Sequence, residues 1–209
     1  MSLYLIYAIG FLAQLLFSAR LLVQWIASEK ANKVLSPTLF WQLSMVASFI
    51  LCIYGWLRDD FAIILGQIIS YYIYIWNLQA KDAWSKVPKL MSTIFLILPL
   101  LSVLYFLANW DSSIDRLFKH DNIPIWLIIF GIVGQFTFTL RFIYQWAYSR
   151  QAGESLLPRT FWTISIIGSA MIISYAIIRH DPVLIIGQAS GLVVYIRNIM
   201  IEKKLDAND

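Results

Sequence analysis

The chain has 209 residues, of which 60% are hydrophobic and only 13% are charged, and its formal net charge is +4. An ordinary soluble domain is about 25% charged, so this composition excludes a water-soluble globular protein and indicates an integral membrane protein. The excess of basic residues then belongs in cytoplasmic loops, and we expect no binding to nucleic acid.

Seven stretches are apolar over about the length that a helix needs to cross a bilayer. In chain order they cover residues 3–27, 38–57, 61–78, 89–108, 124–149, 159–178 and 182–201. The first stretch lacks a positively charged start and a small-residue cleavage site, so we interpret it as a retained helix and not as a signal peptide. The sequence therefore predicts an all-α membrane protein with seven transmembrane helices.

The Lys and Arg residues of the loops predict how these helices are oriented. With the N-terminus outside, the cytoplasmic side receives Lys30, Lys33, Lys81, Lys86, Lys89, Arg150, Arg159, Lys203 and Lys204. The outer side then receives only Arg58, Arg116, Lys119 and Arg179. Because basic residues favour the cytoplasmic side, we expect an outer N-terminus and a cytoplasmic C-terminus.

The sequence also contains an internal repeat. With a shift of 121 positions, residues 10–77 align with residues 131–198 without a gap, and 23 of the 68 aligned positions are identical. Shared apolar composition does not explain the polar matches, which include Arg20/Arg141, Gln24/Gln145, Tyr74/Tyr195 and Asn77/Asn198. One helix separates the two groups of three, so both groups have the same orientation and the chain is predicted to be a parallel 3+1+3 repeat.

This pattern divides the chain into four parts. The first three-helix repeat covers residues 1–79, a linker with the fourth transmembrane helix covers 80–123, the second repeat covers 124–201, and a cytoplasmic tail covers 202–209. We expect the shared polar residues to lie along a seam between the two repeats, away from lipid.

The combined pattern R-x-x-x-Q-W-x-x-S, P-x-x-F-W, G-Q and Y-x-x-N resembles the lipid-A-disaccharide synthase N-terminal domain, a three-helix membrane module. The second repeat carries the pattern most fully, and the first departs from it at Trp76 and Phe61, where the second has Arg197 and Pro182. The 3+1+3 plan is also similar, in architecture only, to PQ-loop and SWEET sugar transporters, although neither Pro37-Thr38 nor Pro158-Arg159 is the PQ dipeptide.

The resemblance implies a protein of the bacterial inner (plasma) membrane that works beside lipid A or related lipid-linked sugar metabolism. In fused members of that family the module precedes a soluble glycosyltransferase. This chain ends at Asp209 without such a domain, so we do not expect the synthase reaction from it.

The paired arginines are the first candidates for ligand binding. A charge on a spanning helix costs roughly 2.5–3.5 kcal/mol on insertion scales, so Arg20 and Arg141 should face protein or water. Each shares a helix face with a glutamine four residues later, and a guanidinium group can hold a phosphate through two parallel hydrogen bonds. The alternative is that both side chains extend to the inner headgroups of the bilayer.

A polar stripe on the third helix of each repeat supplies further candidates. It consists of Gln67, Ser70, Tyr74 and Asn77 in the first repeat and of Gln188, Gly191, Tyr195 and Asn198 in the second. Such a stripe can bind sugar hydroxyls, or it can hold helices together. Arg197 has no counterpart in the first repeat, and it either breaks the symmetry of a site or anchors its helix. The candidate substrate-binding residues are Gln14, Arg20, Gln24, Gln67, Tyr74, Asn77, Gln135, Arg141, Gln145, Gln188, Tyr195, Arg197 and Asn198.

Three functions fit these residues. The first is a flippase-like transporter whose partner is a membrane lipid or a lipid-linked sugar phosphate. The second is a non-catalytic membrane subunit that docks a lipid A biosynthesis glycosyltransferase, and the third is a SWEET-like uniporter of small sugars, which leaves the arginines unexplained. The predicted spans contain no Asp or Glu. We therefore expect no catalytic residue, no cofactor and no metal.

Overall fold

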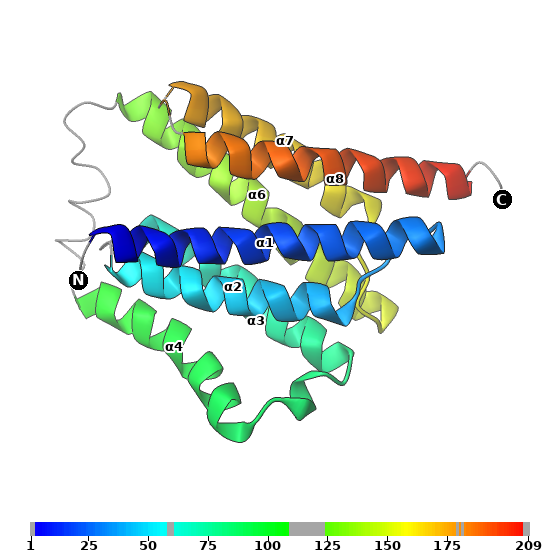
Figure 1. Cartoon of the computed structure of the whole chain (residues 1–209), viewed down its shortest axis with the longest axis horizontal. Helices are drawn as coiled ribbons and strands as arrows, with labels where there is room; N and C mark the ends of the chain where they lie inside the picture. The colour runs from blue at the N-terminus through cyan, green and yellow to red at the C-terminus, as the bar shows by residue number, and fades with distance from the viewer. Residues whose placement is uncertain (1–2, 58–60, 109–123, 179, 181, 207–209) are drawn as a thin grey trace.

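The computed structural model describes residues 3–57, 61–108, 124–178, 180 and 182–206 (Figure 1). These residues form seven α-helices and a short 3-10 helix, η1 (Trp84–Lys86). The α-helices are α1 (Leu3–Ala31), α2 (Thr38–Leu57), α3 (Phe61–Ala80), α4 (Lys89–Ala108), α6 (Ile125–Ala152), α7 (Arg159–Ile178) and α8 (Pro182–Asp206).

The all-α class is confirmed, and each α-helix begins within one residue of its predicted start. The helices α1, α3, α6 and α8 continue beyond the predicted ends. The prediction stopped where the apolar stretch stops, but the polar residues that follow, such as Lys30 and Arg150, still favour helix formation. Among the described residues, α1, α6 and α7 are long and apolar enough to cross a membrane. The predicted outer-loop residues Arg58, Arg116, Lys119 and Arg179 lie outside the described residues.

The helices pack as two groups of three. Within the first group α2 lies against α1 and α3, and within the second α7 lies against α6 and α8. The groups meet where α1 contacts α8 and where α3 contacts α6, and α4 packs beside α2 and α3 (Figure 1). In the repeat, α6 is the equivalent of α1 and α8 is the equivalent of α3. The contact between α1 and α8 is therefore equivalent to the contact between α6 and α3.

The turn after the first helix of each group has the same left-handed backbone conformation, although a different residue adopts it in each group. Asn32 follows α1 with φ 50°, and its counterpart Gly153 follows α6 with φ 75°. Glycine and asparagine are the residues that most readily adopt this left-handed conformation after a helix. Both turns therefore end the helix in the same way and lead into the same short loop.

The helices α6 and α7 approach each other closely at Gly168. A Cβ atom added to Gly168 would lie 2.7 Å from the Cα atom of Phe138 and 2.8 Å from its backbone nitrogen. Residue 168 must therefore be small if α6 is to keep its place, and this matters because Phe138 contacts Arg141, described below.

Candidate functional site at the interface between the repeats

Arg20 is held by all three helices of the first group. It lies in the second half of α1, and its side chain is buried. Its Nη1 atom donates hydrogen bonds to Ser44 Oγ of α2 at 2.8 Å and to Tyr74 Oη of α3 at 3.2 Å. The ring of Phe17, one turn earlier, lies 4.6 Å from the Cζ atom of Arg20. These contacts fix the position of the guanidinium group.

The second group repeats the tyrosine and phenylalanine contacts around Arg141, which is also buried. Its Nη1 atom donates to Tyr195 Oη at 3.3 Å, and the ring of Phe138 lies 3.3 Å from its Cζ atom. Tyr195 and Phe138 are the counterparts of Tyr74 and Phe17. The repeat therefore produces two buried guanidinium groups, each with a tyrosine and a phenylalanine.

Both arginines contact one ring. The centre of the Phe142 ring lies 5.6 Å from the Cζ atom of Arg20 and 4.7 Å from that of Arg141. The positive charges of the two arginines repel each other. Neither forms an ion pair within the part of the chain that the structure describes, and the Nε atom of each is buried without a hydrogen-bond partner there. Two positive charges and two unused donors therefore meet between the groups.

Two reciprocal amide pairs join the groups next to the arginines. Gln24 donates to Asn198 Oδ1 at 2.7 Å, and Asn198 donates back to Gln24 Oε1 at 3.0 Å. Gln145 and Asn77 form the equivalent pair, with distances of 2.9 and 3.0 Å. All four side chains are fully buried. Each repeat thus completes the hydrogen bonds of the other.

The same glutamines also hold the loops that follow their helices. Gln24 Nε2 also lies within hydrogen-bond distance of Ser28 Oγ, at 2.9 Å, and of the backbone oxygen of Leu35, at 3.3 Å, so its two N–H groups are shared among these acceptors and Asn198. Gln145 Nε2 makes the matching contacts with Ser149 Oγ at 2.9 Å and Leu156 O at 2.8 Å. The amide pairs therefore connect the interface with both loops.

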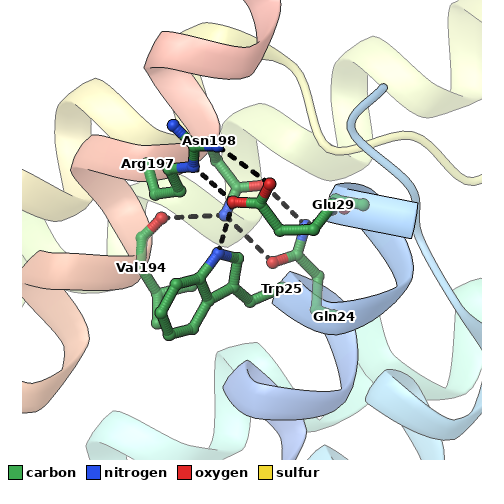
Figure 2. A network of polar contacts seen from close by, with 7 residues as sticks. Gln24, Trp25, Glu29, Val194, Arg197 and Asn198 are labelled. Atoms are coloured by element: carbon green, nitrogen blue, oxygen red, sulfur yellow. Dashed lines mark hydrogen bonds and ion pairs between the residues drawn. The ribbon is translucent and has the colours of Figure 1, made fainter. Parts of the chain in front are cut away.

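An ion pair lies beside one amide pair only (Figure 2). Arg197 of α8 donates through Nε and Nη2 to the two carboxylate oxygens of Glu29 in α1, the latter at 2.9 Å. Trp25 Nε1 donates to the same carboxylate at 2.8 Å. The counterparts of Glu29 and Arg197 are Arg150 and Trp76, so the second amide pair has no equivalent of this ion pair.

Two segments of the chain, residues 9–79 and 130–200, match the family model described as the Lipid A Biosynthesis N-terminal domain. The chain belongs to this family. The two matches cover the two repeats, so the chain carries the Lipid A Biosynthesis N-terminal domain twice, and the resemblance found in the sequence is confirmed.

The curated relatives of this tandem Lipid A Biosynthesis N-terminal domain are longer proteins. The chain is 31% identical to the lipid-A-disaccharide synthase of Chlamydia felis (strain Fe/C-56) over 95% of its own length and 33% of the relative. It is 30% identical to the lipid-A-disaccharide synthase of Chlamydia pneumoniae over 94% of its own length and 33% of the relative. The chain thus spans about a third of the length of the curated relatives it matches. No solved structure matches it.

The structure brings only some of the predicted residues of the Lipid A Biosynthesis N-terminal domains to the interface. Gln67 and Gln188 accept hydrogen bonds from Ser48 at 2.7 Å and Ser169 at 2.9 Å, within their own groups. Gln14 and Gln135 are exposed and lie outside the buried cluster. The residues that do meet there are Arg20, Gln24, Tyr74, Asn77, Arg141, Gln145, Tyr195, Arg197 and Asn198.

Sequence reasoning missed several residues of the interface, among them Glu29, Ser36 and Ser155. Glu29 lies beyond the first predicted span and was therefore not considered. Its counterpart in the second repeat is Arg150, and this reversal of charge could have shown that the two repeats differ here. Ser36 and Ser155 form a hydrogen bond at 2.9 Å between the domains, and Ser155 also donates to Asn77 Oδ1 at 2.7 Å. Neither serine is repeated in the other domain, so the internal alignment did not select them.

This asymmetry leaves one tryptophan without a partner. Trp41 Nε1 donates to Ser36 Oγ at 2.8 Å. In the second domain the equivalent residues are Trp162 and Leu157, and leucine cannot accept a hydrogen bond. The buried Trp162 Nε1 therefore has no hydrogen-bond partner among the described residues. The two domains therefore differ in one buried donor.

A Trp41→Phe variant is expected to lose more stability than a Trp162→Phe variant, by about 1–2 kcal/mol in the free energy of unfolding. The first change removes a hydrogen bond, whereas the second removes an N–H group that is buried without a partner. Unfolding of both variants in mixed detergent micelles measures the difference. Equal losses would contradict this account of the two indoles.

Proposed function

We propose that this chain is the membrane-embedded, non-catalytic part of a lipid A biosynthesis glycosyltransferase system. It binds the anionic headgroup of a lipid between its two repeats and holds that lipid for the enzyme. Its seven helices cross the bacterial inner membrane as a 3+1+3 parallel repeat with an outer N-terminus and a cytoplasmic C-terminus. The repeats at 1–79 and 124–201 are joined by the linker at 80–123, and the tail at 202–209 is cytoplasmic.

The observation that carries the proposal is the pair of buried arginines without a carboxylate partner. Transfer of a charged side chain from water into a protein interior costs several kcal/mol, and contacts with aromatic rings return only about 0.5–2 kcal/mol each. Arg20 and Arg141 have aromatic contacts but no counter-ion among the described residues. An anionic headgroup would supply that charge and would accept hydrogen bonds from the two unused Nε atoms.

The remaining polar residues fall into two roles under this proposal. Tyr74 and Tyr195 contact the arginines and present hydroxyl groups beside the headgroup. The Gln–Asn pairs bond to each other and to nearby loop and helix atoms, so we assign them to holding the repeats together. Gln14 and Gln135 are exposed on α1 and α6 and have no part in this site.

The link with a glycosyltransferase is supported by the relatives. The proteins that the chain matches over 94–95% of its length are called lipid-A-disaccharide synthases, and two thirds of their length lies outside the match. A lipid held beside such an enzyme is presented at the membrane surface, where a soluble enzyme can reach its headgroup.

An Arg20→Gln/Arg141→Gln double variant is expected to lose about tenfold or more of the affinity for anionic phospholipid, because each charge-assisted hydrogen bond contributes about 1.5–3 kcal/mol. Native mass spectrometry of the purified chain with added phosphatidylglycerol or phosphatidylcholine measures the bound lipid. The matched control is Arg150→Gln, which removes an exposed arginine of the same helix as Arg141. Unchanged lipid binding in a folded double variant would end the proposal.

Lipid translocation is a second candidate function, and the position of the interface contacts favours it. The polar contacts between the repeats lie in the second halves of α1, α3, α6 and α8, toward the loops at 32–37 and 153–158. Contacts confined to one end allow two bundles to rock about the bound headgroup. Movement of fluorescent lipid between the leaflets of reconstituted vesicles would favour translocation over presentation alone.

A further inference from the structure

We infer that the two arginines form one shared site for a single dianionic phosphate group, a phosphomonoester or a diphosphate carried by a lipid. This inference rests on the proposed function and narrows it, because a phosphodiester lipid such as phosphatidylglycerol should bind more weakly than a lipid with a dianionic headgroup. The alternative is two equivalent sites, one in each repeat, that each bind one singly charged headgroup.

The geometry favours one site because the arginines share a contact that the repeat does not duplicate. Phe142 lies against both guanidinium groups, and its ring packs at 5.0 Å against that of Tyr74 from the other repeat. The counterpart of Phe142 is Leu21, so only one aromatic ring occupies the middle. Since both distances end at the same ring centre, the two Cζ atoms lie no more than about 10 Å apart, a gap that a phosphate or diphosphate bridges with hydrogen bonds of about 2.8 Å.

The charge of the site matches two negative charges. Around the guanidinium groups the described side chains are aromatic rings and the hydroxyl groups of Ser44, Tyr74 and Tyr195, and none of them is a carboxylate. A phosphomonoester carries about −1.5 to −2 charges at pH 7, whereas a phosphodiester carries one. A phosphodiester would leave one buried positive charge without a counter-ion, which is unfavourable in a protein interior.

The hydrogen-bond donors lead to the same ligand. Each guanidinium group has five N–H donors, and the Nε donor of both arginines is buried without a partner. A terminal phosphate offers three strong acceptor oxygens, which lets it accept from both sides at once. A phosphodiester has only two such oxygens, and both esterified oxygens are weaker acceptors.

A lipid, and not free phosphate, is the expected carrier because the helices that carry the arginines expose apolar side chains along their length. Within one to about two turns before the arginines these include Leu12 and Leu15 on α1, and Val133 and Phe136 on α6. Acyl chains can lie against these surfaces while the phosphate reaches the arginines. Inorganic phosphate gains nothing from them.

The ligand itself makes the inference testable by pH. The titratable groups that face the arginines among the described residues are Tyr74 and Tyr195, and no carboxyl or imidazole group faces them. The nearest charged groups on the contacting helices are Glu29 and Arg197, which pair with each other. The dianion of a phosphomonoester takes up one proton near pH 6, so the ligand carries about two negative charges at pH 8 and about one at pH 5.

The experiment compares phosphatidic acid, phosphatidylglycerol and inorganic phosphate on the full chain in lipid nanodiscs. We expect one phosphatidic acid per chain, bound about tenfold tighter than phosphatidylglycerol at pH 8, and a loss of most of this preference at pH 5. Arg20→Gln and Arg141→Gln should each remove the preference alone, since one arginine leaves a singly charged site. The pH comparison needs no variant, so it decides the question even if a variant fails to fold.

Several outcomes overturn the inference. If phosphatidic acid and phosphatidylglycerol bind equally and the double variant binds neither, the site does not prefer a dianionic headgroup. The proposed function then still stands. Two lipids per chain, each lost with one arginine, shows two separate sites, and inorganic phosphate that competes as well as the lipid shows that the lipid chain is irrelevant. If no anionic lipid binds at all, the proposed function fails as well.

Discussion

An Asn77→Leu variant is expected to lose about 3 kcal/mol of the free energy of unfolding. Asn77 donates to Gln145 and to the backbone oxygen of Ile73, and it accepts from Gln145 and Ser155. A leucine fills a similar volume but leaves Gln145 Oε1 buried without its donor and takes the acceptor of Ser155 away. Unfolding in mixed detergent micelles, followed by far-UV circular dichroism, measures the loss.

Asn198→Leu is the matched control for this prediction. Asn198 forms the same amide pair with Gln24, but no serine donates to it, so the loss should be about 1–2 kcal/mol. A loss at Asn198 equal to or larger than that at Asn77 would show that Ser155 contributes nothing to the interface.

A Gly168→Ala variant is expected to lose about 2–3 kcal/mol of stability and to weaken lipid binding at the arginines. The added methyl group would lie 2.7 Å from a backbone atom of Phe138, so α6 and α7 must separate. Because the Phe138 ring lies against Arg141, the separation also displaces that guanidinium group. The unfolding midpoint and the retained lipid, measured on the same preparation, report the two effects.

Gly187→Ala tests whether the loss comes from contact and not from glycine replacement in general. Gly187 lies within α8, and a Cβ atom added there meets no atom within 4 Å. Alanine at a free helix position should stabilise the chain by about 0.5–1 kcal/mol. A Gly168→Ala variant as stable as Gly187→Ala would show that α6 and α7 are not fixed at this distance.

The helices could be placed from the sequence because apolar length and proline position are local signals. Pro37 and Pro158 precede α2 and α7, and Pro182 begins α8, as the predicted starts required. The repeat also identified which residues have counterparts. It did not show that Gln24 contacts Asn198 instead of Asn77, because an alignment of two halves gives equivalence and not contact.

The polar stripe shows where the sequence prediction ends. Gln67 and Asn77 lie on one helix face by periodicity, yet Gln67 bonds to Ser48 in its own group and Asn77 bonds to Gln145 in the other. The crossing of α3 with its neighbours decides which residue reaches which helix, and that crossing depends on packing along the full length of the helices.

The side chains at the middle of the interface had no signal in the repeat. Phe142 contacts both arginines, but its counterpart is Leu21, so the pair does not appear among the identities. A residue close to a pseudo-symmetry axis can serve both halves at once, and a second copy would compete for the same space. Identity between the halves is therefore a poor guide to the residues at their centre.

The ion pair between Glu29 and Arg197 favours association of unlike halves. Two copies of the second half, assembled as a dimer in the same manner, would place Arg197 opposite Arg150, so that like charges would meet. Two copies of the first half would place Trp76 opposite Glu29 and leave the carboxylate without a cation. The charges at these positions therefore favour the mixed pairing, and we expect the two halves, expressed as separate chains, to form a heterodimer.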